Sequence, residues 1–380
     1  MIVHQSCKYR LVLNRQQEAA LLETLDRCRE LYNAALQERR EAYRLAGKTL
    51  TFAHQSAELP LVKVARPEYR NVFSQTLQDV LHRLDRAYQA FFRRVKAGEK
   101  PGFPRFQGRN RYDSFTYPQY GNGATLEHDG GKWGTLTLAK LGTLKVRMHR
   151  PVQGTIKTVT IRRDGDQWFV CFSCLVEATP LPETDTATGV DLGLLHFATL
   201  ADGSTIENPR HLRRALGKLK KAQQQLSRCK RGSHRRARAK QTVARLHRKV
   251  RNQRADFCHK AARQLVNRYG TMVFEDLKVR NMVQNHSLAL SISDAGWGQF
   301  VQCCVVKAAS AGRHIVFVDP RYTSQVCSGC GAIRKKELSE RWHSCGVCGT
   351  ELDRDHNAAI NIARLGCSQH AYGRVEAAPL

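Results

Sequence analysis

Hydrophobic positions recur along most of the chain with spacings that predict its first elements. Residues 7–13 (CKYRLVL) alternate polar and apolar side chains, as a strand with one buried face does. Asn14 suits the N-cap of a helix, because apolar residues follow it at helical spacing as far as residue 35. A second helix is predicted over 72–95, with an apolar stripe that we interpret as helix-bundle core: Leu77, Leu81, Leu84, Tyr88, Phe91 and Phe92.

The segment 135–176 is predicted to be rich in strands. Residues 155–161 and 168–176 are strand-like, and Asp164-Gly165 between them predicts a hairpin turn. Cys171 and Cys174 form a Cys-x-x-Cys pair, but positions i and i+3 of a strand face opposite sides. We therefore interpret both cysteines as packing residues, and expect this segment and the first strand to close a small barrel.

Beyond a polar, Pro- and Thr-rich stretch at 177–187, strand-like and helical patterns alternate. Strands are predicted over 189–200, 271–277 and 314–320, and Asp202-Gly203 is expected to turn the first of them back. A polar loop is predicted over 278–293 and a helix over 297–311. Strands that alternate with helices predict an α/β sheet.

Residues 210–254 contain eighteen Lys or Arg residues and no Asp or Glu. Apolar stripes on either side of Gly232-Ser233 predict a helical hairpin with basic outer faces. Like charges at i,i+4 destabilise a helix by a few tenths of a kcal/mol, and solvated helices normally mix both signs. The pattern therefore favours contact with phosphates, for which the candidate residues are Arg235, Arg236, Arg238 and Lys240.

Composition points to the same class of partner. The chain has 380 residues, 42% of them hydrophobic, and 62 Lys and Arg against 33 Asp and Glu, a formal charge of +29. This length predicts two to four folded units, and the charge favours RNA or DNA. A membrane partner is not expected, because no apolar run approaches about 18 residues. The first residues lack the apolar core of a signal peptide, and nine cysteines are scattered outside the ribbon described below, which favours a reducing cytoplasm.

A linker-like stretch at 96–120 alternates Gly, Pro, Arg and aromatic residues. Arginines such as Arg105 can contact phosphates, and aromatic rings can stack on bases. The alternative is an ordinary surface loop whose rings pack against the rest of a domain. The sequence leaves both interpretations open.

Two Cys-x-x-Cys pairs near the C-terminus, Cys327/Cys330 and Cys345/Cys348, predict a metal site. Four thiolates close a tetrahedral shell around zinc and leave it no open position, so the predicted zinc is structural. The alternative is four reduced cysteines without a ligand.

Three carboxylates stand in similar settings. Asp191 and Glu275 lie within or just after strand-like segments, and Asp355 lies where a helix begins after the second cysteine pair. A carboxylate at a helix start can simply cap it, which is the alternative for Asp353 or Asp355. If the three carboxylates converge at one end of a sheet, a divalent cation makes the cluster tolerable.

These motifs together resemble the TnpB (OrfB) family, transposon-encoded relatives of the type V CRISPR effector nucleases. The resemblance rests on segments 189–193 (GVDLG), 274–277 (FEDL), 323–331 (TSQVCSGCG) and 353–362 (DRDHNAAINI). Segments 91–94 (FFRR) and 102–106 (GFPRF) extend it to the N-terminal part, whereas the residues after about 367 match nothing in the family.

The resemblance implies an RNase H-like (RuvC-like) nuclease domain with an inserted zinc ribbon, and a split barrel, or wedge, with an inserted helical recognition domain. The expected division is the first wedge strand at 1–15, the recognition domain at 16–118, the wedge barrel at 119–182, the nuclease at 183–320 with its basic helical hairpin at 209–268, the ribbon at 321–350, the end of the nuclease at 351–366, and a tail at 367–380.

By the same resemblance the chain is expected to be an RNA-guided DNA endonuclease. Its guide RNA would come from the transposon end, and it would cut double-stranded DNA beside a short flanking motif in a prokaryotic cytoplasm, at the nucleoid. Asp191, Glu275 and Asp355 would hold two Mg²⁺ ions about 3.5–4 Å apart, supported by Asp276, Asp353 and Asn361. Gln75 and Gln78 are the candidate readers of the motif.

Three alternatives remain open from the sequence. They are a guided DNA binder that does not cut, a strand-transfer transposase with a similar carboxylate triad, and a zinc-ribbon nucleic-acid-binding factor without chemistry. Whether the protein acts as a monomer or a dimer is also left open.

Overall fold

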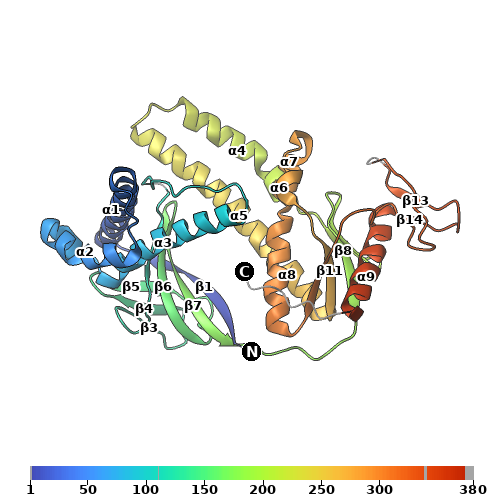
Figure 1. The fold of residues 1–380 in the computed structure, drawn as a ribbon, viewed down its shortest axis with the longest axis horizontal. Helices are drawn as coiled ribbons and strands as arrows, with labels where there is room; N and C mark the ends of the chain where they lie inside the picture. Colours follow the sequence, from blue (N-terminus) through green and yellow to red (C-terminus); the bar gives the residue numbers. More distant parts are fainter. Residues whose placement is uncertain (1, 110, 338–339, 373–380) are drawn as a thin grey trace. The chain divides into compact units, whose positions relative to one another are not determined.

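The computed structural model describes residues 2–109, 111–337 and 340–372, with side chains described as far as residue 368. The chain forms two compact units that divide between Glu177 and Ala178. Figure 1 shows the course of the chain through both units.

The N-terminal unit is built on a seven-stranded antiparallel sheet. In spatial order it contains β2 (Ser114–Tyr117), β6 (Thr155–Asp164), β7 (Gln167–Glu177), β1 (Ile2–Val12), β5 (Gly142–Arg147), β4 (Trp133–Leu138) and β3 (Ala124–Glu127). The predicted first strand and the hairpin turn after Asp164 are confirmed, although β1 begins earlier than expected.

The sheet curls so that its two edges approach each other. Tyr117, in edge strand β2, donates a hydrogen bond of 3.0 Å to the carbonyl of Ala139, directly after β4 near the opposite edge. This closure has the barrel character expected from the sequence. Cys174 is buried and Cys171 half-buried on alternate faces of β7, as predicted for packing residues.

Three α-helices complete the N-terminal unit: α1 (Arg15–Ala46), α2 (Phe52–Ala65) and α3 (Ser74–Lys96). Asn14 caps α1 as predicted, in a capping box with Gln17. The sequence pattern did not indicate α2, which buries only Gln55 and Leu59 and contains Pro60. In α3, Leu77, Leu81 and Leu84 are buried core, but Phe92 is 52% exposed, so assigning the whole stripe to the core was wrong.

The C-terminal unit contains a five-stranded sheet in the order β10 (Thr205–Glu207), β9 (His196–Leu200), β8 (Ala187–Asp191), β11 (Thr271–Glu275) and β12 (His314–Val318). Strands β8, β11 and β12 are parallel, and β9 and β10 join as antiparallel neighbours. The predicted single strand over 189–200 was wrong. Its middle reverses at Gly193, whose amide donates to the carbonyl of Phe197.

Helices cover both faces of this sheet. Met272 and Phe274 pack in a core with α5 (His234–Arg268) and α8 (Trp297–Ala311), whereas Val273 points to the other face and packs with Ile362 of α9 (Arg354–Tyr372). This alternation follows from the two-residue period of a strand. The mixed α/β architecture predicted for this half is therefore confirmed.

The helices that remain to be described are α4, α6 and α7. The predicted basic hairpin is confirmed as α4 (His211–Arg228) and α5, with Ser233 as the N-cap of α5. The predicted polar loop at 278–293 was wrong, because α6 (Val279–Met282) and α7 (His286–Ala295) form there, α7 capped by Asn285. In the part of the chain that the structure describes, no helix combines the length and apolar character needed to cross a membrane.

Candidate active site and metal centre

Asp191 and Glu275 lie at the carboxyl ends of neighbouring parallel strands. The register of β8 and β11 pairs Val190 with Phe274, so each carboxylate is the next residue along its strand. Carboxyl ends of parallel strands in an α/β sheet are where binding sites form. The structure therefore brings these two predicted residues to one edge of the sheet.

Helix α9 carries Asp355 to the same edge. A β-carbon on Gly189 would lie 2.1 Å from the carbonyl oxygen of Ala359, so the helix packs directly on the backbone of β8. Asp355 lies one helical turn before Ala359. At the start of the helix, Asp353 accepts hydrogen bonds from the amides of Asp355 (2.8 Å) and His356 (3.3 Å). Asp353 is thus the capping residue, and the Asp355 carboxylate is not used as the cap.

The three carboxylates share an unfavourable electrostatic environment. Burial raises the pKa of Asp191 well above its ordinary value, and the nearby charges of Glu275 and Asp355 raise it further, while Arg354 opposes the shift. Burial also raises the pKa of Asp355, with Asp353 adding to it and Arg341, Arg354 and His196 opposing it. The mutual repulsion of such a buried carboxylate cluster is relieved by a bound proton or a cation, which makes the cluster a candidate functional site.

Glu275 is held by a residue whose role the sequence did not indicate. The Thr323 hydroxyl donates a hydrogen bond of 2.5 Å to Oε1 of Glu275. Burial raises the pKa of Glu275, and this hydrogen bond favours its ionised form. The Thr323 carbonyl in turn accepts from Nδ2 of Asn361 on α9, at 2.9 Å. Thr323 therefore joins β11 to α9 at the carboxylate cluster.

The same contacts anchor the cysteine-bearing segment. Asn357 accepts a hydrogen bond from the amide of Ser328 and donates one to the carbonyl of Val326. Both Asn357 and Asn361 are buried on α9. The sequence predicted a supporting role for Asn361 but no role for Asn357. Of the other supporting candidates, Asp276 is paired with Lys278 at the surface.

The four ribbon cysteines converge as predicted, next to the hairpin of β13 (Trp342–Ser344) and β14 (Glu351–Asp353). Among the described residues, theirs is the single group of at least three His, Cys, Asp or Glu side chains whose ligand atoms all lie within 4.8 Å of one another. The Sγ atoms of Cys327 and Cys348 are 3.6 Å apart, and so are those of Cys330 and Cys345. The three carboxylates are spaced more widely than this.

The chemistry of these sulfurs fits zinc. Hydrogen bonds from Thr350 lower the pKa of Cys348 to about 6. Burial opposes ionisation of Cys327, but backbone amides lower its pKa to about 7. The amide of Ala332 favours the thiolate of Cys330, yet the neighbouring sulfurs, Cys348 first, raise its pKa to about 12. A soft cation such as Zn²⁺ removes the repulsion between neighbouring thiolates, because all of them then bind to the same positive charge.

The candidate nucleic-acid-binding residues have different surroundings. Gln75 donates to Gln119 at 3.0 Å, and Gln78 and Arg105 are exposed. On the basic hairpin Arg235, Arg238 and Lys240 are exposed. Arg236 instead donates to the carbonyls of Leu226 and Cys229 and so closes the turn between α4 and α5.

Comparison with family models finds three matches. A model described as a probable transposase, OrfB_IS605, matches residues 166–286, and the Cas12f1-like TNB domain matches residues 297–362. A helix-turn-helix domain model matches residues 1–48. Within this range the structure has β1 and one continuous helix, α1.

Relatives of full length are also found. A putative RNA-guided DNA endonuclease of Streptomyces pristinaespiralis is 36% identical over 379 residues, covering 98% of this chain and 91% of the relative. The putative RNA-guided DNA endonuclease InsQ of Escherichia coli K12 is 31% identical and covers 98% and 94%.

Solved structures share the fold at low sequence identity. A Cas12f1 chain in complex with single-guide RNA and target DNA has a TM-score of 0.60 at 13% identity, covering 95% of this chain and 99% of that one. A Cas_phi3 mini-RNA-guided endonuclease has a TM-score of 0.55 at 9% identity, covering 96% and 92%.

Proposed function

Since the chain belongs to the TnpB (OrfB) family of transposon-encoded proteins, we propose that it is an RNA-guided endonuclease that cuts double-stranded DNA. The convergence of Asp191, Glu275 and Asp355 at one edge of the C-terminal sheet is the observation that carries the proposal. The relatives named as RNA-guided DNA endonucleases support it across nearly the whole chain.

The carboxylate cluster would hold two Mg²⁺ ions. Carboxylate oxygens are the hard ligands that Mg²⁺ prefers. Burial and neighbouring carboxylates raise the pKa values of Asp191 and Asp355, and a bound cation would favour their ionised forms. When bound, the ions supply the charge that activates water and stabilises the leaving 3′ oxygen of a phosphodiester.

Contacts within the chain orient two of the three ligands. Glu275 is oriented by the Thr323 hydroxyl, and Asp355 by the helix start that Asp353 caps. The backbone of Gly193 adds a wall to the site, because a β-carbon there would lie 3.6 Å from Oδ2 of Asp355. Arg341 and Arg354 bring positive charge to Asp355, which favours its ionised form.

The remaining roles follow from the family. A structural zinc ion would be held by Cys327, Cys330, Cys345 and Cys348. The guide RNA would pair with one DNA strand and so supply sequence specificity, and the basic surface would bind the guide and the heteroduplex. The domain division and the readers of the flanking motif, Gln75 and Gln78, remain part of this proposal, as does action on nucleoid DNA in the cytoplasm.

A plasmid-cleavage assay with co-expressed element RNA tests the function. We expect cutting by the wild type with Mg²⁺, and none by Asp191→Ala, Glu275→Ala or Asp355→Ala, while each variant still co-purifies with RNA. Asp256→Ala is the matched control, because Asp256 lies on α5 and pairs with Lys260 at the surface.

Other outcomes would replace the proposal. Cutting by the triple-alanine protein would refute the catalytic assignment. Strand-joined products would indicate a transposase, and guided binding by the wild type without cutting would indicate a DNA-binding protein.

A further inference from the structure

A large open groove lies within the N-terminal unit. It has a volume of about 1370 Å³ and is formed by the second half of α1, the segment leading into α2, the end of α3 and the stretch that follows α3. The apolar part of its lining is mainly aromatic, and the aliphatic residues are Leu50 and Ala53. The rings belong to Tyr43, Phe52, Tyr88, Phe92, Phe103 and Phe106, among others.

Four of these rings are exposed to an extent that is unusual for large apolar side chains. Tyr43 is 68% exposed, Phe92 52%, Phe103 44% and Phe106 46%. Contiguous exposed apolar surface on a soluble protein commonly marks a binding site. The exposed rings therefore indicate that the groove binds a partner with flat apolar faces.

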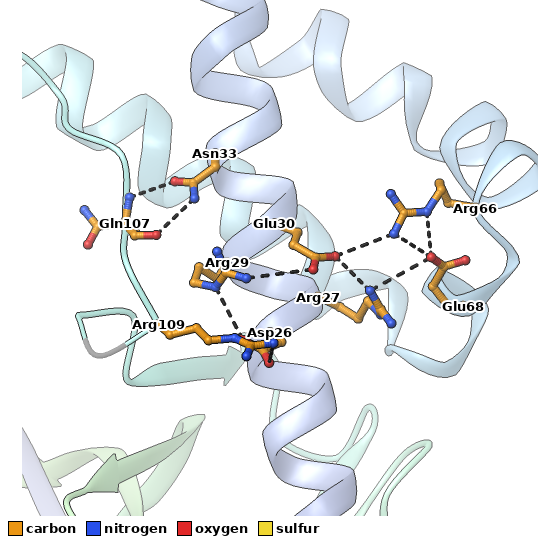
Figure 2. A network of polar contacts seen from close by, with 9 residues as sticks. All are labelled: Asp26, Arg27, Arg29, Glu30, Asn33, Arg66, Glu68, Gln107 and Arg109. Atoms are coloured by element: carbon orange, nitrogen blue, oxygen red, sulfur yellow. Dashed lines mark hydrogen bonds and ion pairs between the residues drawn. The ribbon is translucent and has the colours of Figure 1, made fainter. Parts of the chain in front are cut away.

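The segment that carries Phe103 and Phe106 is fixed rather than loose. Nδ2 of Asn33 on α1 donates to the carbonyl of Gln107 at 3.0 Å, and the amide of Gln107 donates to Oδ1 of Asn33 at 2.7 Å, as Figure 2 shows. Pro104 between the two rings is buried, and Phe103 packs edge-on against Tyr88 at 5.5 Å. The rings are thus already positioned, which lowers the entropic cost of binding.

Positive charge accompanies the rings. The Arg40 guanidinium lies 5.5 Å from the ring centre of Phe106 and 5.9 Å from that of Phe103, and Arg44 also lines the groove. The acidic groups of the lining have partners, since Asp85 pairs with Arg39 at 3.0 Å and Glu41 accepts from Gln37.

Rings interleaved with arginine match the chemistry of unpaired nucleotides. Bases stack on aromatic side chains and guanidinium planes, while the guanidinium also neutralises phosphate.

We propose that the groove binds unpaired bases of single-stranded RNA. The choice of RNA rests on the proposed function, because a guide RNA is present before any DNA strand is separated and so can cover the rings in the resting complex. Of the two interpretations of residues 96–120 that the sequence left open, this proposal selects stacking on bases for Phe103 and Phe106.

The test measures preference for bases rather than total affinity, because a chain of charge +29 binds any polyanion. Full-length protein is titrated with a short fluorescent oligoadenylate RNA and with an RNA backbone of equal length that lacks bases. We expect the wild type to prefer the base-bearing strand. The preference should fall by about 5-fold or more in Tyr43→Leu/Phe103→Leu, and should also fall in Arg40→Gln, which leaves every ring in place.

Trp133→Leu is the matched control. Trp133 is 39% exposed on β4 of the same unit and has Lys145 4.4 Å from its ring, but it does not line the groove. The preference should survive this change. Thermal melts of all variants check that a loss does not reflect unfolding, and Arg40→Gln decides the matter if the double variant is unstable.

Several results would overturn the inference. They are an unchanged preference in the groove variants or an equal loss in Trp133→Leu. Self-association of the wild type that disappears in the groove variants would assign the groove to a second copy of the chain. The binding assay does not measure cleavage, so a negative result for the groove does not affect the nuclease proposal. Conversely, a protein that does not cut DNA can still show the preference for base-bearing RNA.

Discussion

The carbonyl oxygen of Ala359 lies 2.1 Å from the place where a β-carbon on Gly189 would stand. Helix α9 consequently rests on the bare backbone of β8 two residues before Asp191, and the same helix carries Asp355 one turn before Ala359. Gly189 has no unusual backbone angle that would call for glycine. The close approach of the helix accounts for it.

We predict that Gly189→Ala separates Asp355 from Asp191. The added methyl group meets backbone atoms, which cannot move aside as a flexible side chain can, so we expect a loss of about 1–3 kcal/mol in the free energy of unfolding and loss of plasmid cleavage. Gly217→Ala is the control, because nothing lies within 4 Å of its β-carbon position in α4. It should keep cleavage and gain about 0.5–1 kcal/mol. Normal cutting by Gly189→Ala would refute the packing argument.

Thr323→Val should weaken the site without removing a carboxylate. The hydrogen bond that this change removes favours ionised Glu275, so the pKa of Glu275 should rise and the acidic limb of the pH–rate profile should move to higher pH. Hydrogen bonds to charged groups contribute about 1.5–3 kcal/mol, which corresponds to about tenfold or more in apparent Mg²⁺ affinity. Thr323→Ser keeps the hydroxyl and should restore the wild-type profile. An unshifted profile in Thr323→Val would contradict this role.

The sequence predicts what depends on local spacing. The four cysteines can be recognised because each Cys-x-x-Cys pair fits one tight turn. Asp191 and Glu275 can be recognised because each ends a strand-like segment. Thr323 and Asn357 act through hydrogen bonds to residues distant in the sequence, and nothing in their local pattern indicates these partners. Arg236 looks like its basic neighbours and yet closes a helix turn.

The errors in the predicted fold also arise where the structure depends on contacts that local sequence does not reveal. Residues 189–200 are mostly apolar, and the turn between the two strands contains Leu192, Leu194 and Leu195, so the reversal at Gly193 leaves no polar break in the sequence. Helix α7 buries only Ile292, Asp294 and Ala295. Asp294 accepts from the amides of Leu212 and Arg213, a tertiary contact that local composition cannot indicate.

Asp191→Asn should stabilise the metal-free protein while abolishing cleavage. Because the folded-state pKa of Asp191 is raised, the folded protein keeps a proton that the unfolded chain has lost. Stability of the wild type in EDTA should therefore fall as the pH rises from about 4. The gain in stability that Asp191→Asn gives over the wild type should be absent near pH 4 and largest at pH values above the raised pKa of Asp191. Thermal melts across pH check this, and Mg²⁺ should raise the melting temperature of the wild type more than that of the variant.

Asp202→Asn provides a control of opposite sign. Burial tends to raise the pKa of Asp202, but hydrogen bonds from Ser204 and Tyr269 and the charge of Arg268 leave it below its ordinary value. Its stabilising effect should therefore be present at neutral pH and be lost as the pH falls through the lowered pKa. Asp202→Asn should lower the melting temperature at neutral pH. Equal shifts in both variants would mean that general loss of negative charge, not the site, sets the effect.

Loss of the ribbon metal should also impair cleavage, although the zinc lies outside the carboxylate cluster. Metal analysis should find one zinc per chain, which Cys345→Ser should lose and Cys174→Ser, a change at another buried cysteine, should retain. Metal binding supplies much of the folding free energy of such ribbons, and Asn357, Asn361 and Thr323 join this ribbon to α9 and Glu275. Full cleavage by zinc-free Cys345→Ser would show that the contacts between the ribbon and the carboxylate cluster do not contribute to cleavage.

The basic hairpin should divide into residues that bind phosphate and one that holds the fold. Arg238→Gln and Lys240→Gln change exposed side chains, so each should reduce the salt dependence of RNA affinity, by about 0.7 in the log–log slope for every phosphate that the variant no longer neutralises, with unchanged thermal stability. Arg236→Gln should instead lower the melting temperature, because the carbonyls of Leu226 and Cys229 lose their donor. Salt titrations and melts of the three variants separate the effects. A slope change in Arg236→Gln without destabilisation would place this arginine on the RNA as well.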